Sequence, residues 1–96
     1  MSGALFSLEG FLTLSSSMAH AAEAQEWDVV ARLGQERATL LETMPADLAR
    51  HLLPAERAQA RLMLERCREL DARTSALAGE RQKELRVLLR EPVLAP

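Results

Sequence analysis

Aromatic and β-branched residues are scarce in this sequence. Phe6, Phe11 and Trp27 are the only aromatic side chains, tyrosine and isoleucine are absent, and valine occurs at four positions. Strands favour aromatic and β-branched side chains, whereas the residues that dominate here, Leu, Ala, Arg and Glu, favour helices. The composition therefore argues against a sheet and predicts an all-α fold.

Cysteine, histidine and glycine are too few or too scattered to form the common catalytic and ligand-binding motifs. Cys67 is the single cysteine, so it cannot form an internal disulfide, and the four glycines form no phosphate-binding loop. His20 and His51 lack a His or Cys three or four residues away, which a metal site on one helix needs. We expect no catalytic residue, no metal and no cofactor, and interpret Cys67 as a small core residue rather than a nucleophile.

Long apolar runs are also missing. No window approaches the roughly 20 apolar residues of a membrane-spanning helix. The apolar stretch 4–14, which small residues follow, could imitate a secretory signal. It has no basic region before it and is interrupted by Glu9, so a signal peptide is the less favoured alternative. We therefore expect a cytoplasmic protein without membrane insertion.

The length of the chain predicts one small domain with a marginal core. A chain of 96 residues buries only about 60 to 65% of the surface that it exposes when unfolded. We expect a single helical domain over residues 1–96 that gains stability from a partner or from a second copy.

The net charge of −2 conceals an asymmetry between the two halves. Residues 1–48 carry two arginines against seven acidic residues, and residues 49–96 carry ten basic against seven acidic residues. Oppositely charged helices that pack side by side would explain this balance. Acidic residues alternate with the arginines of the second half, so we expect no direct binding of nucleic acid.

Hydrophobic periodicity predicts two helices in the first half. One spans about residues 4–23. The other spans about residues 26–43, because the repeat of apolar residues restarts in a new phase at Trp27. Neither Gly nor Pro marks the break, so a single kinked helix is the alternative. The first seam has small or apolar residues every three or four positions, namely Ala4, Leu8, Phe11, Ser15, Met18 and Ala22. The second seam consists of Trp27, Val30, Leu33, Arg37, Leu40 and Met44.

Prolines bound the segments that follow. Pro45 ends the second helix, because the residue before a proline is pushed out of the α region, and a connection spans residues 44–53. Pro54 then starts a long helix over about residues 54–90, because its fixed φ suits the first helical position. The expected fold is an antiparallel helical bundle of two shorter helices and one long C-terminal helix.

The long helix carries a heptad-like seam. Its members are Ala60, Met63, Cys67, Leu70, Thr74, Leu77, Arg81, either Glu84 or Leu85, and Leu88. Asp71 lies beside the seam, and we expect it to pair with Arg68 on a solvated face. Pro92 is expected to end the helix and to leave residues 91–96 as a tail.

Three residues on the seams have more than one interpretation. The aliphatic parts of Arg37 and Arg81 are expected to pack along the core, with each guanidinium group reaching a carboxylate or solvent. Pairing with an acid on a partner protein is the alternative. Trp27 is expected to anchor the first two helices onto the third rather than to stack on a ligand. The shorter helices cannot cover the whole long helix, so an apolar stripe near residues 74–89 predicts a binding surface.

The order and spacing of these motifs over residues 8–89 resemble the FliT family of flagellar proteins. Residues 18–28, Met-Ala-His-Ala-Ala-Glu-Ala-Gln-Glu-Trp-Asp, are similar to the family's helix end, polar turn and Trp-Asp start. A pattern like the family's Leu, Glu-Arg and Leu-Leu pattern follows at Leu33, Glu36, Arg37, Leu40 and Leu41. Residues 64–71 and 81–89 are similar to its closing helix.

The resemblance implies a cytoplasmic chaperone of flagellar type III export, with no catalytic centre. It implies binding of the filament-cap protein before export, contact with components of the export ATPase complex and, in some members, restraint of the flagellar master transcription regulator. An amphipathic partner segment would dock on an apolar stripe. We expect it to contact Leu33, Leu40, Leu41, Leu70, Leu77 and Leu85.

Two further expectations follow. Better-known members of the family carry a C-terminal segment that folds back and gates partner binding, whereas only residues 91–96 follow the long helix here, so we expect constitutive binding. The alternative function is a structural helical homo-oligomer or adaptor with no chaperone role, in which the heptad-like seam pairs two copies as a homodimer.

Overall fold

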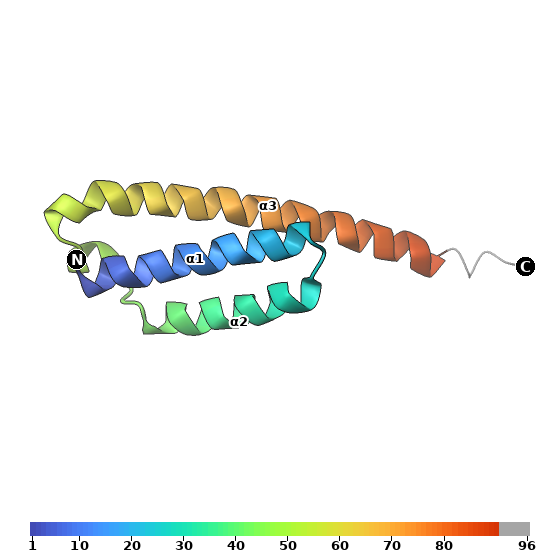
Figure 1. Ribbon diagram of the computed structural model, residues 1–96, viewed down its shortest axis with the longest axis horizontal. Coiled ribbons are helices and arrows are strands. Elements are labelled where there is room, and N and C mark those ends of the chain that lie inside the picture. Colours follow the sequence, from blue (N-terminus) through green and yellow to red (C-terminus); the bar gives the residue numbers. More distant parts are fainter. Residues whose placement is uncertain (91–96) are drawn as a thin grey trace, which may run out of the picture.

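The computed structural model describes residues 1–90, and these residues form three α-helices and no strand (Figure 1). The α-helices are α1 (Gly3–Glu23), α2 (Trp27–Thr43) and α3 (Arg57–Arg90). Two short 3₁₀ turns, η1 (Leu48–His51) and η2 (Pro54–Glu56), lie between α2 and α3. The prediction of an all-α bundle with two shorter helices and one long C-terminal helix is confirmed.

The observed helices lie close to the predicted ranges. α1 starts one residue before the predicted 4–23, and α2 starts one residue after the predicted start of 26–43. The long helix opens with the 3₁₀ turn η2 at Pro54 and becomes α-helical at Arg57. The predicted tail 91–96, with Pro92 as the helix stop, lies outside the described residues.

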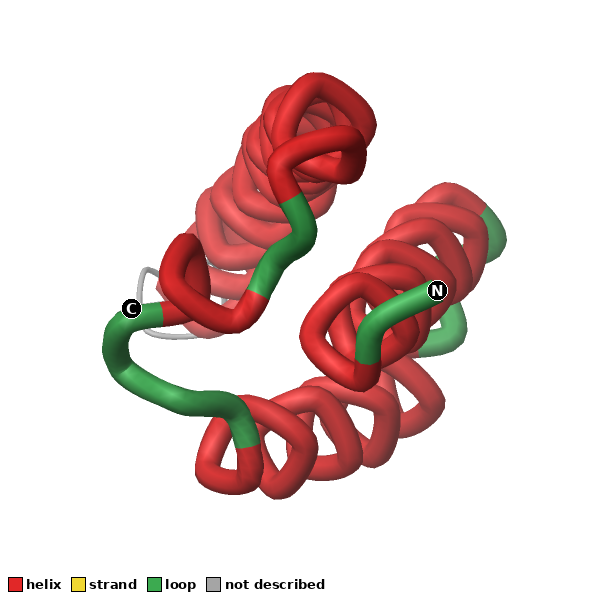
Figure 2. The backbone as a smooth tube through the Cα atoms, turned by 90° about the vertical axis from the view of Figure 1, so that its left-hand side faces the viewer, coloured by secondary structure: helices red, strands yellow, loops and turns green. Residues whose placement is uncertain are grey.

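α1 is the central helix of the bundle (Figures 1 and 2). It packs along both α2 and α3, whereas α2 and α3 barely approach each other. α2 has no fully buried residue, and it docks on α1 through half-buried side chains. The core therefore lies on α1 and on one face of α3. Its apolar members are Ala4, Leu5, Leu8, Met18, Ala19, Ala21, Ala22, Ala60, Cys67 and Leu70.

α3 extends well beyond the other two helices. Its 34 residues span about 51 Å, against about 31 Å for the 21 residues of α1. The molecule is elongated as a result, with extents of 67 × 21 × 21 Å. Every residue from 80 to 90 is exposed, so the end of α3 forms an overhang that the shorter helices do not cover.

α1 and α2 are two separate helices joined by a tight turn. The backbone N–H of Gln25 donates to Ala22 O at 3.0 Å, and the N–H of Glu26 donates to Ala21 O at 2.9 Å. Gln25 itself has φ 61, the left-handed conformation that usually ends a helix at a glycine. These bonds form a Schellman motif, so the alternative of one kinked helix is wrong.

The start of α1 is tied to the start of α3 by Glu56. The Ser2 hydroxyl caps α1 by accepting from the Leu5 N–H at 3.1 Å. The Glu56 carboxylate accepts from the Ser2 N–H and from the Leu53 N–H, each at 2.9 Å. Hydrogen bonds from the Ser2 hydroxyl and from these two backbone groups hold the pKa of Glu56 below its ordinary value.

Candidate partner-binding site

The end of the bundle where α2 stops contains an apolar hollow that opens between α2 and α3. We call it the basin, and its volume is about 450 Å³. It is lined by Leu8, Phe11, Leu41, Met44, Pro45, Ala46, Leu48 and Leu64. α1 forms its floor, while α2, the connection with η1, and α3 form its sides. The basin exists because α2 and α3 both pack on α1 without closing on each other.

Two leucines on opposite sides of the basin remain accessible. Leu41 of α2 is 57% exposed and Leu64 of α3 is 40% exposed, above the fully buried Leu8 of α1. Apolar side chains that line a concave surface and stay in water are typical of a docking site. The basin can therefore accept apolar side chains from another molecule.

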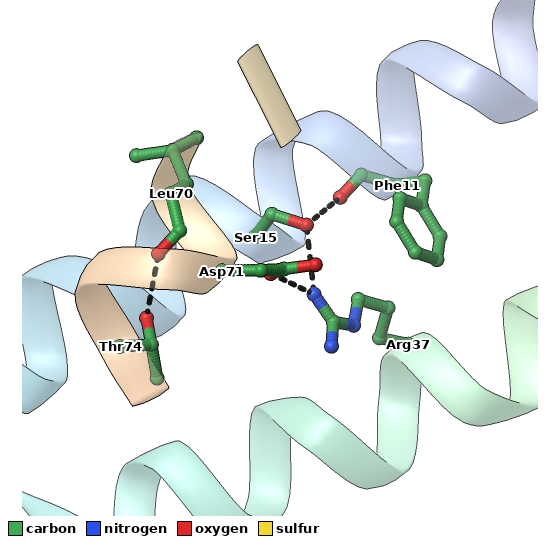
Figure 3. A network of polar contacts seen from close by, with 6 residues as sticks. All are labelled: Phe11, Ser15, Arg37, Leu70, Asp71 and Thr74. Atoms are coloured by element: carbon green, nitrogen blue, oxygen red, sulfur yellow. Dashed lines mark hydrogen bonds and ion pairs between the residues drawn. The ribbon is translucent and has the colours of Figure 1, made fainter. Parts of the chain in front are cut away.

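A polar bridge from α2 to α3 borders the basin (Figure 3). Arg37 Nη1 donates to Asp71 Oδ1 at 2.6 Å and to Ser15 Oγ at 3.0 Å. The guanidinium carbon of Arg37 lies 5.0 Å from the ring centroid of Phe11, which also lines the basin. Ser15 is fully buried and in turn donates to Phe11 O at 3.0 Å. Within residues 1–90 this is the only ion pair between α2 and α3.

The bridge confirms one expectation and corrects another. The guanidinium group of Arg37 reaches the carboxylate of Asp71, as the preferred interpretation of this arginine predicted. The predicted pairing of Asp71 with Arg68 on a solvated face is wrong, because Asp71 turns toward α2 and accepts from Arg37. A charged group beside the seam is drawn inward when a cation from another helix lies within reach.

Cys67 lies next to this bridge and is a buried residue of the core. Burial raises the pKa of the Cys67 thiol, and the neighbouring Ser15 hydroxyl offsets only part of the effect. A buried thiol with a raised pKa is a poor nucleophile.

A second surface surrounds Trp27 at the other end of α2. We call it the Trp27 site; its hollow has a volume of about 220 Å³. It is lined by Ala22, Glu23, Gln25, Trp27, Leu77, Glu80, Arg81, Glu84, Leu85 and Leu88. The Arg81 guanidinium lies over the Trp27 ring at 5.2 Å from its centroid. An ion pair of 2.5 Å between Arg73 and Glu23 joins α3 to the end of α1 close by.

Three of the six predicted contact leucines lie on these two surfaces, but not together. Leu41 lines the basin, whereas Leu77 and Leu85 line the Trp27 site. The predicted set therefore divides between two ends of the molecule.

The other three predicted leucines are less accessible. Leu33 and Leu40 are half-buried on α2, and a methyl group added at Gly10 of α1 would lie 3.4 Å from Leu40 Cδ2. Leu70 is buried in the core on α3 and is not available to a partner in this structure. We therefore leave Leu70 out of the proposed contact surface.

Part of the basin was not predicted from the sequence. Four lining residues were not among the predicted contacts, namely Phe11, Met44, Leu48 and Leu64. Leu64 could have been found, because it lies beside the heptad-like seam and so cannot share the burial of Cys67 and Leu70.

Residues 1–90 contain no group of three or more His, Cys, Asp or Glu side chains that could hold a metal ion. None of the helices described is long and apolar enough to cross a bilayer.

A helical bundle with accessible apolar hollows between its helices belongs to the class of small helical binding proteins. A family model described as "Flagellar protein FliT" matches residues 5–92, so the chain belongs to the FliT family. No curated protein and no solved structure matches the chain. FliT proteins are non-catalytic chaperones, and membership implies a role in flagellar export rather than an enzymatic one.

Proposed function

We propose that this chain is a cytoplasmic flagellar type III export chaperone that holds an amphipathic segment of the filament-cap protein in the basin. The observation that supports this proposal is the pair of accessible leucines, Leu41 and Leu64, on opposite sides of an apolar floor. An amphipathic helix that places apolar side chains in such a hollow is a common mode of peptide recognition. The cytoplasmic location of FliT chaperones supports the proposed compartment.

The basin offers a modest but specific gain of free energy. Each half-exposed leucine that a partner covers contributes about 1 kcal/mol, since full burial of a leucine is worth about 1.5 to 3 kcal/mol. Leu8 in the floor is already buried, so it shapes the basin and adds little further burial when a partner binds. Contacts along the rest of the partner segment must supply the remaining free energy of binding, because two leucines alone fall short of a millimolar Kd.

Calorimetric titration with the C-terminal segment of the filament-cap protein from the same organism tests the proposal. We expect saturable one-to-one binding that Leu64→Glu abolishes, because a carboxylate in the basin is costly to desolvate. Leu62→Glu is the matched control, since Leu62 is 66% exposed on the same helix and does not line the basin. No binding by a chain that circular dichroism shows to be folded would contradict the proposal.

We assign the remaining partners implied by the family, components of the export ATPase complex and the flagellar master transcription regulator, to the Trp27 site and the overhang of α3. Leu85, Val87, Leu88 and Leu89 are all exposed there. Co-purification with Leu88→Glu should lose these partners and keep the filament-cap segment. Loss of both classes of partner would contradict separate surfaces.

A structural homo-oligomer is the alternative, and the same exposed stripe on α3 favours it. A second copy could cover Leu85 and Leu88 in a helical pair. Sedimentation velocity over a concentration series distinguishes the two functions. Self-association that persists in the presence of every flagellar partner would favour the structural role.

A further inference from the structure

One face of α3 is directed toward α2 and the basin. Arg57, Arg61, Leu64, Arg68 and Asp71 recur at intervals of four, three, four and three residues, so they share one side of the helix. Leu64 of this set lines the basin, and Asp71 bonds Arg37 of α2. Arg57, Arg61 and Arg68 therefore follow the edge of the basin that α3 forms.

These three arginines are accessible to a partner. All three are exposed, and within residues 1–90 none of them forms an ion pair. Arginines on other sides of α3 are engaged, because Arg66 pairs with Glu69 and Arg73 pairs with Glu23. The α3 edge of the basin thus carries positive charge that the described part of the chain does not neutralise.

Arg37 lies next to the basin, and its charge is already paired with Asp71. Its guanidinium has five N–H donors, and in residues 1–90 the described hydrogen bonds use only Nη1. The side chain is 23% exposed and stacks over Phe11, a residue of the basin itself. Its remaining N–H groups are not used by these hydrogen bonds and can donate to a further carboxylate.

We propose that the basin selects amphipathic segments that carry carboxylates beside their apolar stripe. This inference rests on the proposed function and names the chemistry of its partner: leucine-like side chains fill the basin while Asp or Glu side chains pair with Arg57, Arg61, Arg68 and Arg37. Charge complementarity around an apolar centre gives selectivity and faster association. A nucleic-acid backbone would satisfy the arginines but would leave the apolar basin empty.

Two synthetic amphipathic peptides of about 18 residues, or ~27 Å of helix, test the selectivity. They share one leucine stripe, and one peptide has glutamate at the flanking positions where the other has lysine. Fluorescence anisotropy at low salt should show about tenfold or greater preference for the glutamate peptide, and the preference should shrink at high salt. Equal affinity for both peptides would overturn the selectivity for carboxylates.

Variants of the chain locate the effect. The double variant Arg61→Glu with Arg68→Glu should weaken the glutamate peptide about tenfold, as expected for the loss of two surface charge pairs. Arg61→Gln with Arg68→Gln is the milder version if the reversal disturbs folding. Arg66→Glu is the matched control and should change nothing, since Arg66 does not belong to this edge of α3.

The outcomes separate this inference from the proposed function. Binding of the glutamate peptide together with failure of the filament-cap titration would reject that partner and keep the selectivity. If the filament-cap segment binds with an affinity that substitution of Arg61 and Arg68 does not change, the partner is kept and the selectivity for carboxylates is overturned. Displacement of the glutamate peptide by a short DNA duplex would overturn it in favour of a nucleic-acid surface.

Discussion

Arg37 of α2 and Asp71 of α3 form a 2.6 Å ion pair that joins the two helices that otherwise barely approach each other. The bridge holds α2 in place from its middle, while the turn at Gln25 holds its start. A helix without a fully buried residue depends on such contacts for its position. The shape of the basin therefore depends on this polar contact as well as on the packing of α2 along α1.

Loss of this ion pair should cost measurable stability. Asp71→Asn removes the charge that Arg37 faces, and we expect the free energy of unfolding to fall by about 1 to 2 kcal/mol, because a half-buried charged hydrogen bond is lost. Urea denaturation followed by circular dichroism measures the change. Glu65→Gln on an exposed position of the same helix should stay within about 0.5 kcal/mol. Equal effects of the two substitutions would show that the bridge contributes nothing specific.

Acid should weaken the contact between the start of α1 and the start of α3. The pKa of Glu56 is lowered in the folded chain, so its contribution to stability is complete above the ordinary pKa of the unfolded-state carboxyl. That contribution is lost as the pH falls through the lower folded-state pKa. Urea midpoints measured from pH 6 to pH 3 should fall more steeply for the natural chain than for Glu56→Gln. Parallel curves for the two chains would contradict this role.

The turn between α1 and α2 offers a stabilising substitution. Gln25 has φ 61, where a side chain is strained and glycine is not, so Gln25→Gly should stabilise the chain by about 1 kcal/mol. A change of this size raises Tm by about 4 to 8 °C in a chain of this length. Gln35→Gly, inside α2, is the opposite control and should destabilise by about 0.5 to 1 kcal/mol. A lower Tm for Gln25→Gly would mean that the Gln25 side chain makes a contact worth more than the strain.

The helices could be predicted from the sequence because apolar residues recur every three or four positions where a helix packs against a neighbouring helix. Ala4, Leu8 and Met18 on α1 are buried as their spacing indicates. Pro45 and Pro54 bound the connection because proline restricts the backbone locally. These features depend on local sequence, so no knowledge of the tertiary arrangement is needed to find them.

The binding surface depends on how the helices are placed, and the sequence predicts it poorly. Leu64 and Leu70 are both leucines of α3, yet one lines the basin and the other is buried against α1. The inward turn of Asp71 depends on the position of Arg37 in another helix. The left-handed conformation at Gln25 has no glycine to signal it. Each of these features arises from contacts between segments distant in the chain.

The thiol of Cys67 should be protected in the folded chain. It is buried beside Ser15, and burial raises its pKa, so little thiolate is available near neutral pH. Labelling with an aromatic disulfide reagent should be slow in buffer and should accelerate through the urea transition, in parallel with the loss of helicity. Fast labelling in buffer would show that α1 and α3 separate readily, and a larger share of the core would then be open to partners.

Trp27 is predicted to anchor the helices, so its removal should loosen α2 and the end of α1 from α3. Trp27→Ala takes away the ring beneath Arg81 and the packing beside Leu77 and Leu85, and we expect a loss of about 2 to 3 kcal/mol, below that of a fully buried tryptophan because the ring is half-buried. Trp27→Phe keeps a ring face for Arg81 and should lose less than half as much. Urea denaturation measures both variants. A Trp27→Ala chain that kept its full stability while losing a partner would instead make Trp27 a contact residue, because a ring that contributes nothing to the fold is free to contribute to binding.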